Sequence, residues 1–357
     1  MLNPTTFREI VSGRRRGLLA GVVRGLLRLC EFPYSWVMRR RNARYDSGKA
    51  EVHRVGVPVV SVGNLSMGGT GKTPLVEWIA RYLVRQRNLK VALVSRGYGA
   101  AADGVNDEAM ELELALPEVP HEQNRDRVAA ALTVIDEHGS QVIVLDDGFQ
   151  HRRLGRDLDI VLLDATEPFG FRHVFPRGTL REPLAGLQRA DVVMLSRADM
   201  IDEIAREEVR QHVELVAPEA LWCEVVHGPA GLINSEGGML SLDVLKRKRV
   251  AVFCGIGNPK GFRHTLDGLG CDIARWREFP DHYRYTEEDI ASIADWASDA
   301  DLVLCTRKDL VKVREVCLGE VPLWAVGIEL RFLVGEESLK KKLKSTLNQR
   351  TGAPPSA

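Results

Sequence analysis

The stretch "VPVVSVGNLSMGGTGKTPLVEW", residues 57–78, decides the fold. Its valine-rich start predicts a buried strand, and "KTPLVEWIARYLVRQ" (72–86) predicts the helix that follows. Between them, "SMGGTGKT" (66–73) is close to the pattern GxxxxGK followed by Ser or Thr, with Ser66 in place of the first glycine. A glycine-rich turn followed by Lys-Thr, between a strand and a helix, predicts a phosphate loop that binds a nucleotide.

The residue types in this loop suit the chemistry of phosphate binding. Glycines let backbone N–H groups turn toward phosphate oxygens, and the N-terminus of the following helix favours negative charge. The lysine can reach the β- and γ-phosphates, and the threonine hydroxyl can hold Mg²⁺. The predicted nucleotide-binding residues of the loop are Gly68, Gly69, Thr70, Gly71, Lys72 and Thr73.

An acidic partner for the metal is expected at the end of another buried strand. The segment "QVIVLDDG" (141–148) supplies Asp146 and Asp147 in that position. Asp-Asp-Gly is also a common turn sequence, which is the simpler interpretation. The phosphate loop upstream in the same predicted sheet favours the metal-binding interpretation.

The body of the chain alternates between apolar strands and helices. Continuous runs of β-branched residues indicate strands that are covered on both faces, and the alternation indicates a parallel sheet. We therefore predict an α/β fold, with a mostly parallel sheet of the P-loop NTPase type sandwiched by helices. The segments that carry this pattern are "KVALVSRGYG" (90–99), "RVAAALTVIDEHG" (127–139), "LDIVLLDA" (158–165) and "ADVVMLSRAD" (190–199).

A second, smaller α/β domain is expected after residue 224. Glycines cluster in 227–242, the long apolar runs stop there, and a new series of strands and helices follows a short hinge. The expected parts are a basic amphipathic segment (1–50), a nucleotide- and acceptor-binding domain (51–224), a smaller domain with the hinge (225–348) and a disordered tail (349–357).

Composition excludes several classes of protein. The 357 residues are 45% apolar, and the 49 basic residues balance the 49 acidic ones. A general nucleic-acid binder would carry an excess of basic residues, so no nucleic-acid partner is expected. The six cysteines have no CxxC or CxxH spacing and indicate reduced thiols in a cytosolic protein.

The N-terminal segment concentrates positive charge. Residues 1–44 hold ten arginines and only two acidic residues. On a helical wheel, the apolar residues of 14–41 occupy one half, and Arg24 interrupts them well short of the ~20 residues that span a membrane. A signal peptide and a helix packed on the domain are alternatives. The arginine density and Trp36 favour an amphipathic helix in the membrane interface.

Several classes of enzyme share a phosphate loop. A GTPase would show an Asn/Thr-Lys-x-Asp motif, which "SRAD" (196–199) and "TRKD" (306–309) lack. A ParA/MinD-like ATPase would carry a lysine where this chain has Met67. A kinase that acts on a membrane lipid would use both the loop and the basic helix. The alternative is a membrane-associated P-loop ATPase that couples hydrolysis to a partner protein.

Longer motifs carry a family resemblance. With the phosphate loop, "DDGFQHRRLGRDLDIVLLDA" (146–165), "FPRGTLREPL" (175–184) and "FPDHYRYTEEDI" (279–290) resemble the tetraacyldisaccharide 4'-kinase (lipid A 4'-kinase) family from about residue 30 to about residue 330. The resemblance implies two α/β/α domains joined by a short β hinge, which close over ATP.

The same resemblance implies a monotopic enzyme on the cytoplasmic face of the bacterial inner membrane. We predict no obligate protein partner. It would transfer the γ-phosphoryl group of ATP, with Mg²⁺, to the 4'-hydroxyl of tetraacyldisaccharide 1-phosphate.

Site residues follow from the resemblance position by position. Asp107 corresponds to the base on the sugar hydroxyl, and His282 to its histidine partner from the second domain. Asp146 corresponds to a metal ligand, Asp147 with Lys72 to catalytic groups, and Tyr98 to an aromatic residue near the nucleotide. The residues expected to line the acceptor or phosphate region are Arg127, Gln150, His151, Arg181 and Glu182.

The chain departs from the family pattern near the expected acceptor region. Arg177 and Thr179 stand where alanine and proline are usual, and the segment 100–105 is shorter than usual. Neither departure affects the residues expected to bind ATP.

Overall fold

A computed structural model describes residues 4–97, 107–281 and 283–351. Contacts divide the chain into two compact units. The first unit comprises Met1–Arg96, Glu122–Val226 and Phe332–Ala357, and the second comprises Gly97–His121 and His227–Arg331. Each unit is built on a mostly parallel arrangement of strands, as the continuous apolar runs predicted.

The first unit holds the phosphate loop at the end of its central strand. Its strand order is β7-β6-β5-β1-β4-β2-β3, and β1 lies parallel between β4 and β5. The strands are β1 (Val59–Asn64), β2 (Val91–Ser95), β3 (His121–Gln123), β4 (Val142–Asp146), β5 (Leu158–Asp164), β6 (Val192–Ser196) and β7 (Leu221–Ile233). The helices are α3 (Lys72–Arg81), which continues as a π-helix over Tyr82–Gln86, α5 (Arg127–His138), α6 (Glu203–Val216) and α10 (Glu336–Thr351).

Both faces of the central strands are buried. Ile143 and Leu145 of β4 pack against α5, and Val161 of β5 and Val193 of β6 pack in the cluster that includes α6. Residues that point the other way, such as Val144, are equally inaccessible to solvent. Burial on both faces explains why these strands carry unbroken apolar sequences, and it confirms the predicted α/β class.

The second unit has the strand order β10-β9-β11-β13-β7. Its strands are β8 (Met239–Leu240), β9 (Arg249–Cys254), β10 (Asp272–Glu278), β11 (Leu302–Thr306), β12 (Cys317–Leu318) and β13 (Val321–Val334), and its helices are α4 (Asp107–Ala115), α7 (Pro259–Asp267), α8 (Glu287–Ala297) and α9 (Arg307–Val313). Phe253, Ile293 and Leu323 lie in one of its cores. Long strands β7 and β13 each begin in one unit and end in the other.

The units differ from the expected domains in two segments. Residues 97–121 group with the second unit, where α4 contacts α9, although the sequence suggested an uninterrupted domain over 51–224. The C-terminal segment returns to the first unit, and α10 extends to Thr351, into the expected tail. Arg350 Nε donates to Asp157 Oδ1 at 2.8 Å, which ties this last turn down. Such long-range contacts leave no local signature in the sequence.

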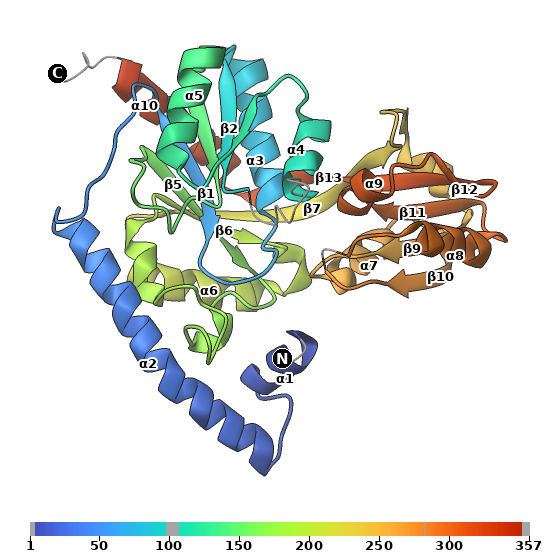
Figure 1. The fold of residues 1–357 in the computed structure, drawn as a ribbon, viewed down its shortest axis with the longest axis horizontal. Helices are drawn as coiled ribbons and strands as arrows, with labels where there is room; N and C mark the ends of the chain where they lie inside the picture. The colour runs from blue at the N-terminus through green and yellow to red at the C-terminus, as the bar shows by residue number, and fades with distance from the viewer. Residues whose placement is uncertain (1–3, 98–106, 282, 352–357) are drawn as a thin grey trace. The chain divides into compact units, whose positions relative to one another are not determined.

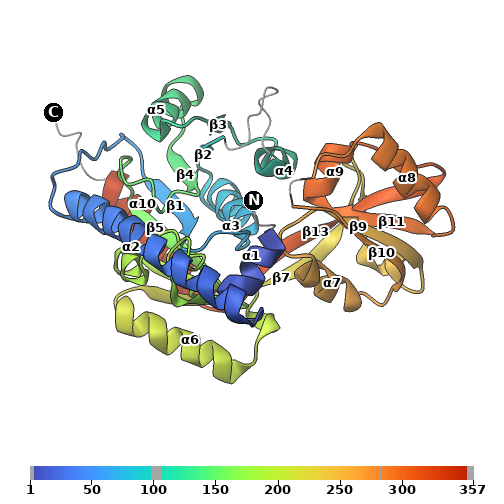
Figure 2. The same ribbon diagram turned by 60° about the horizontal axis from the view of Figure 1, so that its bottom comes forward.

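Two helices precede the first strand. The helix expected over 14–41 is α2 (Leu18–Asp46), which contains Pro33, and the sequence did not indicate the short α1 (Pro4–Val11) before it. Figures 1 and 2 show α2 as one long helix, with α1 beside its N-terminal end. Among the described residues, no helix is both long and apolar enough to cross a membrane.

Candidate active site

The phosphate loop has the backbone conformation that its glycines predicted. Gly68 has φ 114° and Gly71 has φ 81°, values that side chains disfavour, and Gly71 precedes the first residue of α3, Lys72. Ser66 forms a bridge with Leu180 and is not among the residues of positive φ, so no glycine is required there. The departure from the usual first glycine is therefore compatible with the loop.

Buried polar side chains hold the loop from two strands. Asn64, at the end of β1, is fully buried, and its Nδ2 donates to Thr70 Oγ1 at 3.1 Å and to the Gly68 carbonyl at 3.4 Å. From the end of β6, Ser196 Oγ donates to the Thr70 carbonyl at 2.7 Å. Protein groups alone thus hold the loop, which lowers the entropic cost of binding a phosphate.

Asp147 lies between two cations. Lys72 Nζ is 3.5 Å from its Oδ1, and Arg181 Nη1 is 2.8 Å from its Oδ2. Asp147 also has φ 53°, a strained value of the kind found at functional sites. Burial alone would raise the pKa of Asp147, but the charges of Lys72 and Arg181 outweigh it and lower the pKa below its ordinary value. The side chain is therefore an anion at neutral pH.

The arrangement fits Mg²⁺ held together with a nucleotide. Asp146 ends β4 and is 5% exposed, and Thr73 lies half-buried in the first turn of α3. In the described part of the chain, no three His, Cys, Asp or Glu side chains form a metal cage. Mg²⁺ takes one or two carboxylates and completes its shell with water and substrate phosphates, so Asp146 and Thr73 are sufficient as its protein ligands.

Glu182 is a buried residue that holds its neighbours in the site through hydrogen bonds. It is completely buried, and its carboxylate accepts from Gln150 Nε2 at 3.1 Å, Asn42 Nδ2 at 2.6 Å and Arg189 Nη2 at 3.0 Å. Gln150 Nε2 also donates to the Asn64 carbonyl at 3.0 Å. Glu182 therefore positions its neighbours, and the sequence placed it among the residues expected to line the acceptor or phosphate region.

Arg127 and His151 lie in a basic part of the site. Arg127, the first residue of α5, is 5% exposed, and burial lowers its pKa although the charge of Asp147 opposes this effect. Burial, together with the charges of Arg127, Arg156 and Arg41, lowers the pKa of His151 to about 4. His151 is therefore neutral at pH 7, and the positive charge beside Asp147 comes from Lys72 and arginines.

Some predicted residues cannot be placed. Tyr98 and His282 lie outside the described residues, and of Asp107 only the backbone, at the start of α4, is described. Conversely, the sequence did not indicate Asn64 and Arg197. Arg197 pairs with Asp164 and donates from Nη2 to the Gly69 carbonyl at 2.9 Å, so it braces the loop from the turn after β6. A polar residue at the end of a buried strand is the sequence signal that could have identified Asn64, at the end of β1, and Arg197, after β6.

The site combines a phosphate loop at the end of a central parallel strand, the loop lysine Lys72, and the carboxylates of Asp146 and Asp147. This combination defines a P-loop nucleotide-binding enzyme. Sequence comparison narrows the class. The family model for tetraacyldisaccharide-1-P 4'-kinase matches residues 23–348. The chain belongs to this family.

Individual relatives match over nearly their full length. The tetraacyldisaccharide 4'-kinase of Anaeromyxobacter sp. (strain Fw109-5) is 38% identical over 325 residues, covering 86% of this chain and 87% of the relative. That of Anaeromyxobacter sp. (strain K) is 37% identical, covering 93% of each chain. The crystal structure of LpxK from Aquifex aeolicus in complex with ATP has a TM-score of 0.73 and 29% identity, covering 91% of this chain and 99% of that one.

These findings confirm the predicted class of enzyme. The chain is a kinase that uses ATP, with Mg²⁺ as the metal for a kinase of this kind. The phosphate loop, Asp146 and Asp147 are the residues of the first unit that fit these cofactors.

Proposed function

We propose that this enzyme transfers the γ-phosphoryl group of ATP to the 4'-hydroxyl of tetraacyldisaccharide 1-phosphate in lipid A biosynthesis. The observation that carries the proposal is the family match over residues 23–348, which includes the braced phosphate loop and the Lys72–Asp147–Arg181 cluster. The reaction needs ATP, Mg²⁺ and the lipid, and no protein partner.

The chemistry follows from the charges in the site. The 4'-oxygen attacks the γ-phosphorus, the bond to the β-γ bridging oxygen breaks, and ADP leaves with its electron pair. Bound Mg²⁺ would neutralise charge on the phosphate oxygens, with Thr73 and Asp146 as its protein ligands. Lys72 would reach the β- and γ-phosphates, and the backbone N–H groups of the loop would cradle them. Arg181 keeps Asp147 ionised and oriented for the metal and the nucleophile.

The acceptor side of the reaction rests on the family resemblance. We assign proton removal from the 4'-hydroxyl to Asp107, with His282 as its partner, and contact with the nucleotide to Tyr98. The residues assigned to the acceptor or phosphate region are Arg127, Gln150, His151, Arg181 and Glu182. Gln150 and His151 lie three and four residues after Asp147 in sequence, which supports this assignment. We further propose that the first unit is the ATP-binding domain and the second a smaller domain.

The proposal includes a membrane surface as a partner, because α2 exposes an apolar stripe. Leu18 and Leu19 are 92% and 84% exposed, far more than a helix packed on the domain would allow. On a wheel of 100° per residue, the exposed apolar residues of α2 fall within about 140° of one another. They are Leu18, Leu19, Val22, Leu26, Leu29, Phe32, Trp36 and Val37.

The C-terminal part of α2 is hydrogen-bonded to residues of the site, which supports a peripheral position of the enzyme on the membrane surface. Tyr34 Oη donates to the Arg181 carbonyl at 3.0 Å, Arg41 Nη2 donates to the Gln150 carbonyl at 2.6 Å, and Asn42 binds Glu182. Arg40 stacks over the exposed Trp36 at 5.5 Å, a pair suited to lipid headgroups. We propose that α2 lies in the cytoplasmic face of the inner membrane and brings the active site to the lipid.

The test is transfer of ³²P from γ-labelled ATP to tetraacyldisaccharide 1-phosphate in detergent micelles with Mg²⁺. Wild type should label the lipid, and Asp107→Ala and His282→Ala should lose most of this activity while still binding ATP. Hydrolysis of ATP without labelled lipid, unaffected by either substitution, would contradict the proposal and favour the partner-coupled ATPase.

A further inference from the structure

The short helix α1 lies outside the residues that the family model matches, which begin at residue 23. It is nevertheless docked on the first unit. Its last residues, Ile10 and Val11, are 5% and 3% exposed. Arg177 Nη1 donates to the Val11 carbonyl at 3.0 Å, and Arg24 Nη1 donates to the Ile10 carbonyl at 3.3 Å. Two cations at the C-terminal end of α1 satisfy its last carbonyls and complement the helix dipole.

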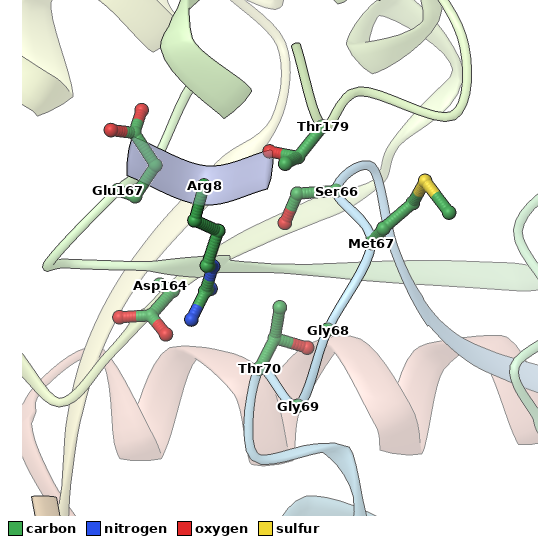
Figure 3. A pocket seen from close by; sticks show the side chains of 9 residues that line it. All are labelled: Arg8, Ser66, Met67, Gly68, Gly69, Thr70, Asp164, Glu167 and Thr179. Atoms are coloured by element: carbon green, nitrogen blue, oxygen red, sulfur yellow. The ribbon is translucent and has the colours of Figure 1, made fainter. Parts of the chain in front are cut away.

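Docking of α1 carries Arg8 to the phosphate loop. Figure 3 shows a pocket in which the Arg8 side chain lies between the loop and two carboxylates. A Cβ atom on Gly68 would lie 3.8 Å from Arg8 Nη2, so the guanidinium group reaches the backbone of the loop. The residues that line this pocket are Arg8, Ser66, Met67, Gly68, Gly69, Thr70, Asp164, Glu167 and Thr179.

The pocket places negative charge beside a loop that must bind an anion. Asp164 is paired with Arg197. Glu167 Oε1 accepts from the backbone N–H of Phe171 at 2.8 Å. Burial raises the pKa of Glu167, and the Phe171 amide and the positive charge of Arg8 oppose this effect. Without Arg8, an ionised Glu167 in this pocket would repel a triphosphate bound at the loop.

We propose that Arg8 is a positioning residue for ATP binding, which offsets the charge of Glu167 beside the phosphate loop and supports the loop at Gly68. Its place depends on α1, and α1 is held by Arg177, one of the two residues of the segment 175–184 that depart from the family pattern. The other, Thr179, lines the same pocket, and its carbonyl accepts from the Met67 backbone N–H at 2.7 Å. Both residues therefore lie where α1 meets the loop, although the sequence suggested that these departures leave the ATP-binding residues unaffected.

The test measures binding of Mg²⁺ and a non-hydrolysable ATP analogue by calorimetry, with no lipid acceptor. It therefore reports on Arg8 even if the proposed lipid acceptor is wrong. The variants are Arg8→Ala, Arg8→Lys, and Arg8→Ala combined with Glu167→Gln. Arg16→Ala is the control, because Arg16 is exposed and does not line the pocket. Thermal melts of each variant check that the fold is retained.

Arg8→Ala should weaken binding roughly three- to tenfold at low ionic strength, with a smaller loss at high salt. Arg8→Lys should restore most of the affinity because it keeps the charge. Glu167→Gln should restore it in the Arg8→Ala background because it removes the repulsion. The proposal is overturned if Arg8→Ala binds like Arg16→Ala, or if its loss persists unchanged with Glu167→Gln.

Discussion

Arg181 binds Asp147 through a single nitrogen, with Nη1 2.9 Å from Oδ1 and 2.8 Å from Oδ2. The two residues come from motifs 34 positions apart in sequence. The Arg181 backbone is held as well, since its N–H donates to the Leu65 carbonyl at 2.7 Å. The segment 175–184 therefore fixes the charge state of the acidic residue beside the phosphate loop.

Arg181→Gln should change the pH dependence of the kinase. Removal of one of its two cations raises the pKa of Asp147, so the acid limb of kcat/KM for ATP should move to higher pH. The direction of the shift follows from the lowered pKa. A carboxylate of this kind stays ionised until the pH falls to its folded-state pKa, where it becomes protonated. Arg210→Gln, in an exposed pair with Glu214, is the control. An unchanged acid limb in Arg181→Gln would show that Asp147 does not titrate in catalysis.

Glu182→Ala should destabilise the first unit. It leaves the partly buried Arg189 guanidinium without its carboxylate, and loss of one partner of such a pair costs about 3 kcal/mol or more. Urea unfolding at pH 7 measures the change. Glu214→Ala, which breaks an exposed pair with Arg210, should cost about 0.5 kcal/mol or less. Equal effects of the two substitutions would contradict the organising role of Glu182.

His151 should remain neutral well below pH 6. Its pKa is lowered to about 4, so the unfolded chain binds more protons between the ordinary value of 6.5 and pH 4. The stability linked to His151 is present above pH 6.5 and declines as pH falls toward 4. NMR titration of the His151 ring should show this low pKa, and His151→Gln should flatten the decline. A titration midpoint near 6.5 would contradict the buried, arginine-rich surroundings.

The double variant Leu19→Gln/Leu26→Gln should lose affinity for anionic vesicles. Both side chains are exposed, so the free energy of unfolding should change little while the membrane-facing apolar area falls. Leu215→Gln on α6 is a matched control, since Leu215 is also 84% exposed but lies outside the stripe. Co-sedimentation measures the effect. If both variants sediment equally with vesicles, α2 is not the membrane-binding surface.

Much of the fold and of the nucleotide site could be predicted because both are encoded locally. The segment 158–165 gave the strand β5 (Leu158–Asp164), and the glycines of the phosphate loop lie where positive φ values are required. Buried parallel strands and phosphate loops have short, continuous signatures, so neighbouring residues are sufficient to recognise them.

The rest of the site depends on contacts that are distant in sequence. The hydrogen bond that Glu182 accepts from Asn42 of α2, 140 residues earlier, has no local signature in the sequence. The short helix α1 is stabilised by Arg177, 166 residues from Val11. Likewise, α4 groups with the second unit through α9, a contact that local patterns do not encode.

The measurement that tests the central claim most directly is the structure of the product that wild type forms from ATP and tetraacyldisaccharide 1-phosphate. ³¹P NMR and mass spectrometry of the extracted lipid should show one added phosphate monoester, placed at the 4'-position, and Lys72→Ala should form none. Consumption of ATP with an unchanged lipid, or a phosphate at any other position, would contradict the account.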